Sequence, residues 1–107
     1  MAGNIVSHQN PIPITYTNRS STVATANVSK TAASPNALRK TFIIKNPASA
    51  TEPLYFRIDG VAATANNLSF DLQPGDSYES PPGLISTAAI TVIAATATHA
   101  YFLVEGQ

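Results

Sequence analysis

The two histidines, His8 and His99, are the residues best suited to proton transfer or metal binding near neutral pH. A metal site needs several ligands that converge on one ion, and neither histidine has another His, Cys, Asp or Glu at a suitable spacing. We therefore expect both to be surface histidines, and we predict no metal site.

Three carboxylates lie near the Pro74-Gly75 step, namely Asp71, Asp76 and Glu79. Calcium loops place acidic ligands at alternate positions, whereas here a proline and a glycine intervene. A turn whose geometry is stabilised by the Asp76 side chain is the better interpretation. The carboxylates therefore predict neither a calcium site nor an acid–base pair.

Nucleophilic catalysis has little support in the sequence. Cysteine is absent, which excludes disulfides, thiolate nucleophiles and Cys-ligated metals. Serine is common, but no G-x-S-x-G elbow exposes one at a strained turn. The expectation is a protein that is not an enzyme and needs no cofactor.

Surface aromatic residues are the remaining candidates for function. In the stretch 53–59, Tyr55 and Arg57 alternate with Leu54, Phe56 and Ile58, so the first two are expected on the solvent side of a strand. Tyr and Arg are enriched where proteins bind partners. We take Tyr55 and Arg57 as a candidate interaction patch.

Length and composition restrict the classes of protein that fit. A chain of 107 residues forms one small domain. It is 44% hydrophobic but only 11% charged, against about 25% charged in ordinary soluble proteins. Six basic and six acidic residues give no net charge and form no cluster, which argues against nucleic acid as a partner.

Two segments could be mistaken for membrane or export signals. The stretch 80–104 contains no Asp, Glu, Lys or Arg, but Pro81, Pro82 and Gly83 interrupt its start and polar residues dilute the remainder. The N-terminus has neither a basic region nor a continuous apolar run. We therefore expect no membrane partner and no secretory signal.

The elements that must position these residues are short strands. Alternation of apolar and polar residues, or clusters of β-branched residues, predict strands at 20–29, 37–46, 53–59, 68–72, 76–80, 88–95 and 100–105. Residues 30–37 are expected to form a loop around Ser34-Pro35-Asn36. In the strand at 37–46, Leu38, Phe42 and Ile44 should face the core and Arg39 the solvent.

The spacing of these strands predicts the fold class. Turn signals occur about every 8 to 14 residues, which is typical of an all-β, antiparallel β-sandwich or jelly-roll-like barrel of seven to eight short strands. A helix at 88–95 is the serious alternative, because alanine favours helices. The β-branched run Ile90, Thr91, Val92 and Ile93 decides for a strand.

The first 18 residues contain no charged side chain, and Pro11-Ile12-Pro13 fixes an extended backbone. The predicted organisation is an extended N-terminal arm at 1–18 and a β-sandwich domain at 19–107. A loose tail or a plain edge strand is the alternative for this arm. Its candidate anchors are the following apolar residues: Ile5, Val6, Ile12, Ile14 and Tyr16.

The stretch from Leu38 to Glu105 resembles small virion proteins of tailed bacteriophages. The matching features are a basic-led strand ending at Asn46, an aromatic strand over 54–60, and an aliphatic strand entering a Pro-Gly-Asp turn over 68–79. The resemblance covers about two-thirds of the chain and includes no catalytic motif.

This resemblance implies a capsid decoration (cement) protein, or a head-fibre or tail-associated module. The implied activity is binding and stabilising the assembled capsid, with the major capsid protein as partner and the capsid exterior of the virion as location. Self-association as a dimer or trimer on the capsid is a further expectation. A glycan- or receptor-binding module is the alternative, with Tyr55, Tyr78 or Tyr101 stacking on sugar rings.

Overall fold

The structure is a computed structural model that describes residues 13–83 and 85–107. In this part of the chain nine strands form two sheets, and no segment is helical. Every strand pair is antiparallel. The prediction of an all-β, antiparallel β-sandwich is confirmed, with nine strands in place of the seven to eight expected.

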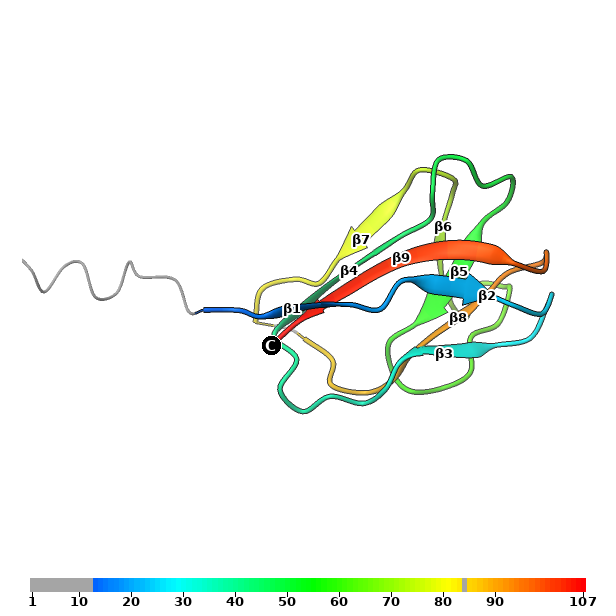
Figure 1. The fold of residues 1–107 in the computed structure, drawn as a ribbon. Coiled ribbons are helices and arrows are strands. Elements are labelled where there is room, and N and C mark those ends of the chain that lie inside the picture. The colour runs from blue at the N-terminus through cyan, green and yellow to red at the C-terminus, as the bar shows by residue number, and fades with distance from the viewer. Residues whose placement is uncertain (1–12, 84) are drawn as a thin grey trace, which may run out of the picture.

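The larger sheet is built around the long strand β9 (His99–Gly106), as Figure 1 shows. On one side β9 pairs with β4 (Thr41–Lys45), which in turn pairs with β7 (Ser77–Glu79). On the other side it pairs with β1 (Tyr16–Asn18) and then with β2 (Ser21–Val23). The first and last parts of the described chain therefore lie side by side.

The smaller sheet has the order β3-β8-β5-β6. Its strands are β3 (Lys30–Ala33), β8 (Ile90–Ile93), β5 (Leu54–Arg57) and β6 (Phe70–Leu72). Strand β3 lies in the range that we expected to be a loop, so that prediction is wrong. Pairing of Lys30 and Thr31 with β8 outweighs the turn signal at Ser34-Pro35, which acts only after the strand has ended.

Strands β1 and β2 are two parts of one edge, interrupted at Arg19-Ser20. The Arg19 amide still donates to the Leu103 carbonyl at 2.7 Å, but the Leu103 amide of β9 bonds to a side chain and not to a backbone carbonyl. The Leu103 amide donates to the Ser20 hydroxyl at 3.0 Å, which replaces a backbone carbonyl. Residues 16–18, within the range expected as an arm, thus form an edge strand.

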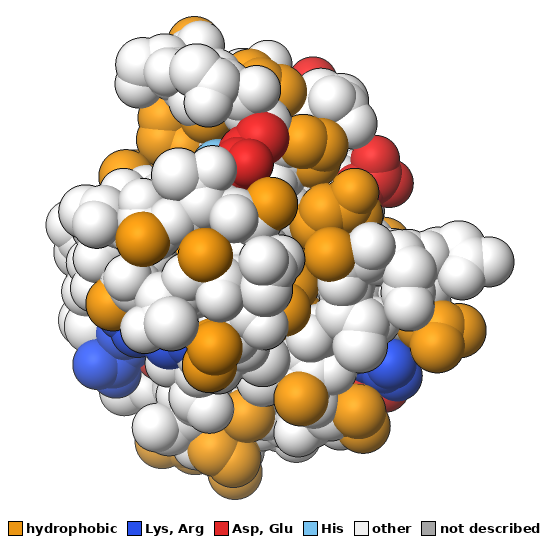
Figure 2. Space-filling model, turned by 90° about the vertical axis from the view of Figure 1, so that its right-hand side faces the viewer, with side chains coloured by type: hydrophobic (Ala, Val, Ile, Leu, Met, Phe, Trp, Pro, Cys, Tyr) orange, Lys and Arg blue, Asp and Glu red, His pale blue; other side chains and the backbone are white. Residues whose placement is uncertain are grey.

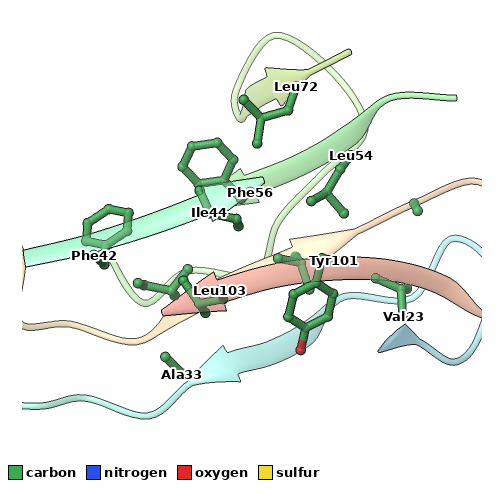
Figure 3. Packing of buried hydrophobic residues seen from close by; sticks show 12 residues of the cluster. Val23, Ala33, Phe42, Ile44, Leu54, Phe56, Leu72, Tyr101 and Leu103 are labelled. Carbon is green, nitrogen blue, oxygen red and sulfur yellow. The ribbon is translucent and has the colours of Figure 1, made fainter. Parts of the chain in front are cut away.

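The core lies between the two sheets, where side chains of both point toward one another (Figure 3). Phe42 and Ile44 of β4 alternate with more exposed neighbours, as the period of two requires. Strand β8 differs because all four of its residues are buried. The 58–69 segment covers its outer side, where the Thr91 hydroxyl donates to the Val61 carbonyl at 2.7 Å.

One part of the expected core is wrong. Leu38 is 67% exposed and Arg39 is buried, the reverse of the prediction. The reason is that Asn36 accepts a hydrogen bond from the Leu38 amide and forms a turn, so regular alternation begins only at Thr41. Leu68 precedes β6 and is 66% exposed, and Phe70, at the start of this short edge strand, is 47% exposed; within the strand only Leu72 is buried.

Candidate functional site

The outer side of the larger sheet carries an apolar surface, which we call the apolar sheet face. Strand register puts Tyr16 beside Gly106, Ile43 beside Val104 and Lys45 beside Phe102, all on the side away from the core. We define this face by five apolar residues: Ile14, Tyr16, Ile43, Phe102 and Val104.

Exposure and packing show that this face is open to solvent. Tyr16, Phe102 and Ile14 are 59%, 41% and 37% exposed. Gly106 lies beneath Tyr16 and Ile14. A Cβ atom at position 106 would clash with Ile14 and lie 2.8 Å from the Thr41 methyl carbon. The absence of a side chain at 106 thus lets the start of the described chain lie flat against β9.

One end of the apolar sheet face is hollowed. Lys45, Pro47, Ala48 and Phe102 line a surface hollow of about 480 Å³. Lys45 is exposed at the rim of this hollow. Glu79, on the neighbouring strand β7, is also exposed and pairs with Ile43 of β4. A partner with an apolar side chain next to a carboxylate would match the Phe102–Lys45 end.

The structure distributes the predicted interaction residues over two surfaces. Ile14 and Tyr16 belong to the apolar sheet face, whereas Tyr55 and Arg57 lie on the outer side of the smaller sheet. Tyr55 and Arg57 are partly exposed and alternate with buried Leu54 and Phe56, as predicted. Ile5, Val6 and Ile12 lie outside the described residues.

Phe102 and Ile43 were not among the predicted interaction residues. The alternation of β9 already contains the signal, because Tyr101 and Leu103 are buried and Phe102 must then point outward. The register that aligns Phe102 with Lys45, and Val104 with Ile43, could not be read from the sequence.

A buried ion pair closes the sandwich near its termini. The Arg39 guanidinium donates to Glu105 at 2.8 Å, to the carbonyls of Ser86 and Ala88 at 2.9 and 2.7 Å, and to that of Ser34 at 3.0 Å. Burial of the Glu105 carboxylate acts to raise its pKa, but hydrogen bonds from Arg39 and Arg19 outweigh this and hold the pKa below its usual range. The pair joins four segments, and each nitrogen of the Arg39 guanidinium donates at least one hydrogen bond to the protein.

His99 is buried, so the prediction of a surface histidine is wrong for this residue. The Asn46 amide nitrogen donates to the carbonyls of Glu52 and Leu72, both at 2.9 Å, which leaves its oxygen as an acceptor. His99 Nε2 lies 2.8 Å from that oxygen and must therefore carry a proton. Its Nδ1 lies 3.3 Å from the Glu52 carboxylate.

This histidine fixes two loops in place. It connects the β8–β9 turn to the segment between β4 and β5, which contains Glu52. A hydrogen bond from Thr96 of the β8–β9 turn is the main cause that lowers the pKa of Glu52. The turn needs such support because the β-branched Thr98 has a left-handed φ of 61°. We interpret the cluster as structural.

The Asp76 side chain supports its turn as predicted, accepting a hydrogen bond from the Gln73 amide at 3.2 Å. Within residues 13–83 and 85–107, no three His, Asp or Glu side chains are grouped as metal ligands. No helix in this same part of the chain is long and apolar enough to cross a membrane. On the face seen in Figure 2, charged side chains are few and separated.

No family model matches the chain, and searches of curated proteins and of solved structures found no similar protein.

Proposed function

We propose that the protein is a structural protein of a tailed-bacteriophage virion that binds the assembled capsid and stabilises it. The apolar sheet face carries this proposal. The patterns at 38–46, 54–60 and 68–79, which resemble small virion proteins, support the choice of a capsid as the partner.

The apolar sheet face suits docking on a large protein surface. Its aromatic residues, Tyr16 and Phe102, stand on the paired strands β1 and β9, so little conformational entropy is lost when they bind. Aromatic side chains on such a rigid base are typical binding hot spots. The ammonium of Lys45 and the carboxylate of Glu79 give the face polar groups that can set its orientation.

The N-terminal residues extend this contact in the proposal. Ile14 lies at the end of the apolar sheet face, and residues 1–12 precede it in the sequence. Prolines at 11 and 13 reduce the entropy lost when such a segment lies along a neighbour. Together, the face and the arm would contact adjacent major capsid subunits or a second copy of the protein.

Stabilisation would arise by mass action. A protein that binds the assembled shell but not its separate subunits shifts the equilibrium toward the intact particle. Repetition of the contact over the shell adds avidity, so each interface can be modest. Such a role requires shape and rigidity and makes no demand on catalytic groups.

The experiment adds purified protein to capsids assembled from the major capsid protein encoded in the same genome. The fraction bound and the temperature at which the particles open are measured. We expect saturable binding and a higher opening temperature, with Phe102→Ser binding about tenfold more weakly or worse. Val28→Ser, which changes an apolar side chain of similar exposure elsewhere, is the matched control and should bind normally.

A second variant tests the arm. Removal of residues 1–12 leaves Ile14 and Tyr16 in place and should lower occupancy without unfolding the sandwich. Normal binding by this truncated protein would refute the role of the arm, and normal binding by Phe102→Ser would refute the role of the sheet face. Absence of binding by the unaltered protein would remove the capsid proposal altogether.

A further inference from the structure

A second hollow lies at the free edge of the smaller sheet and shares no residue with the apolar sheet face. It has a volume of about 450 Å³, within the range of about 300–1,000 Å³ found for small-ligand sites. Its lining comes from the end of β5 and the start of β6, through Arg57, Asp59, Asn67, Leu68 and Phe70.

Phe70 gives this hollow a flat apolar wall. Its ring stacks on the buried Phe56 with centroids 5.1 Å apart and an interplanar angle of 21°, and Tyr78 packs against it with centroids 5.5 Å apart. Those contacts hold the ring in one orientation, yet the residue is still 47% exposed. A held, half-exposed aromatic ring is a platform on which a ligand with an apolar face can stack.

Arg57 and Asp59 form a preorganised polar group at the rim. Arg57 donates to the two carboxylate oxygens from Nε at 3.1 Å and from Nη2 at 2.5 Å. The Val61 amide also donates to Asp59, which fixes the carboxylate. Within the described residues Nη1 of Arg57 has no acceptor, so this donor can be used by a ligand.

The two opposite charges cancel, which decides the class of ligand. An anionic ligand would meet the Asp59 carboxylate, and a cationic ligand the Arg57 guanidinium. A neutral molecule with hydroxyl groups can accept from Arg57 and donate to Asp59 at once. The amide of Asn67, exposed on the lining, adds both a donor and an acceptor.

We infer that this hollow binds a neutral hexopyranose unit of a glycan, with an apolar face of the sugar ring on Phe70 and its hydroxyls on Arg57, Asp59 and Asn67. Such a sugar combines the flat apolar surface and the neutral hydroxyl groups that the hollow matches. The inference does not depend on the capsid proposal, because it concerns another surface. A virion protein could bind its shell with one side and a glycan with the other.

The test is a titration of the isolated ¹⁵N-labelled protein with methyl glucoside, methyl galactoside and methyl mannoside, followed by amide chemical shifts. We expect saturable shifts with at least one sugar, at an affinity of about millimolar, confined to residues 57–59 and 67–70. Uniform small shifts or none with all three sugars would overturn the inference.

Variants distinguish a specific site from weak sticking to an aromatic ring. Phe70→Tyr keeps the platform and should bind normally, whereas Phe70→Leu keeps apolar volume but loses the flat ring and should lose saturable binding. Arg57→Met should weaken binding about tenfold while the remaining amide spectrum stays folded. Tyr55→Ser, on the same sheet but outside the hollow, is the control and should bind as before. If Arg57→Met and Phe70→Leu bind normally, the site is wrong.

Discussion

Two regions of the molecule each contain an ion pair between an arginine and a carboxylate, and the two pairs differ in burial and in hydrogen bonding. The Arg39 and Glu105 side chains are 0% and 3% exposed, and each nitrogen of the Arg39 guanidinium donates to the protein. Arg57 and Asp59 are 23% and 49% exposed, two residues apart, and within residues 13–83 and 85–107 one nitrogen of the guanidinium has no acceptor. The first pair fastens the fold, and the second can serve a ligand.

The difference lies in what each pair connects. Arg39 contacts Glu105, Ser86 and Ala88, which are far from it in the sequence, so these contacts exist only in the folded state. Arg57 and Asp59 are near neighbours and can meet even in the unfolded chain. Burial, sequence separation and completeness of hydrogen bonding therefore separate a structural ion pair from a functional one here.

The largest expected effect comes from breaking the buried pair. Arg39→Met removes one partner and leaves the Glu105 carboxylate buried with only Arg19 and Asn36, so we expect a loss of about 3–5 kcal/mol in the free energy of unfolding. Urea denaturation followed by circular dichroism measures this. Arg39→Lys is the sharper comparison, since it retains the charge but not the planar fork, and it should also be clearly destabilised. A loss below 1 kcal/mol for both variants would contradict the structural role.

The second test is the pH dependence of stability. The folded pKa of Glu105 is below its ordinary value of 4.5, so the unfolded state binds a proton at a higher pH than the folded state does. The stabilisation is fully present above about 4.5 and is lost as the pH falls through the folded pKa of Glu105.

Urea midpoints measured from neutral pH down into this range should therefore fall on acidification. Glu52, whose pKa is also lowered, contributes in the same direction, which Glu52→Gln can separate. Stability that stays level down to the lowest pH would show that neither carboxylate is stabilised by folding.

Arg19 is an intermediate case. Its Nε donates to Glu105 at 2.8 Å, but its side chain is 48% exposed and Arg39 remains to neutralise the carboxylate. Arg19→Ala should therefore cost about 0–1 kcal/mol, measured by the same urea titration. A loss as large as that of Arg39→Met would mean that exposure does not separate the two arginines.

The smallest expected effect on stability is at the exposed pair. Arg57→Met and Asp59→Asn should leave the thermal unfolding midpoint unchanged, because a surface ion pair between residues two apart contributes little to the free energy of unfolding. Calorimetry on the two variants gives the measurement. A marked drop in the midpoint would show that this pair is structural and would weaken its assignment to a ligand site.

Much of the fold was predictable because each strand carries its own signal. Leu54 and Phe56 alternate with Tyr55 and Arg57 and face the core as predicted. The β-branched run at 90–93 forms a strand despite its flanking alanines. Errors occurred where a local turn changed the pattern, as with Leu38 and Arg39.

The candidate surfaces were predictable only in part. Tyr16 and Arg57 were identified from residue type, but Phe102, on the same sheet face as Tyr16, and Phe70, on the same hollow as Arg57, come from distant strands. His99 was misplaced for the same reason, since Asn46 and Glu52 reach it only after the sheets have formed. Residue type indicates what a side chain can do, and register decides what lies beside it.

The sequence by itself determined that this is an all-strand chain with little charge and no cysteine, because strand periodicity and composition are local properties. Only the tertiary structure decided which arginine is enclosed and which is open, and which aromatic rings share a surface. Those outcomes depend on pairing between segments far apart in the chain. No spacing within one segment can specify that pairing.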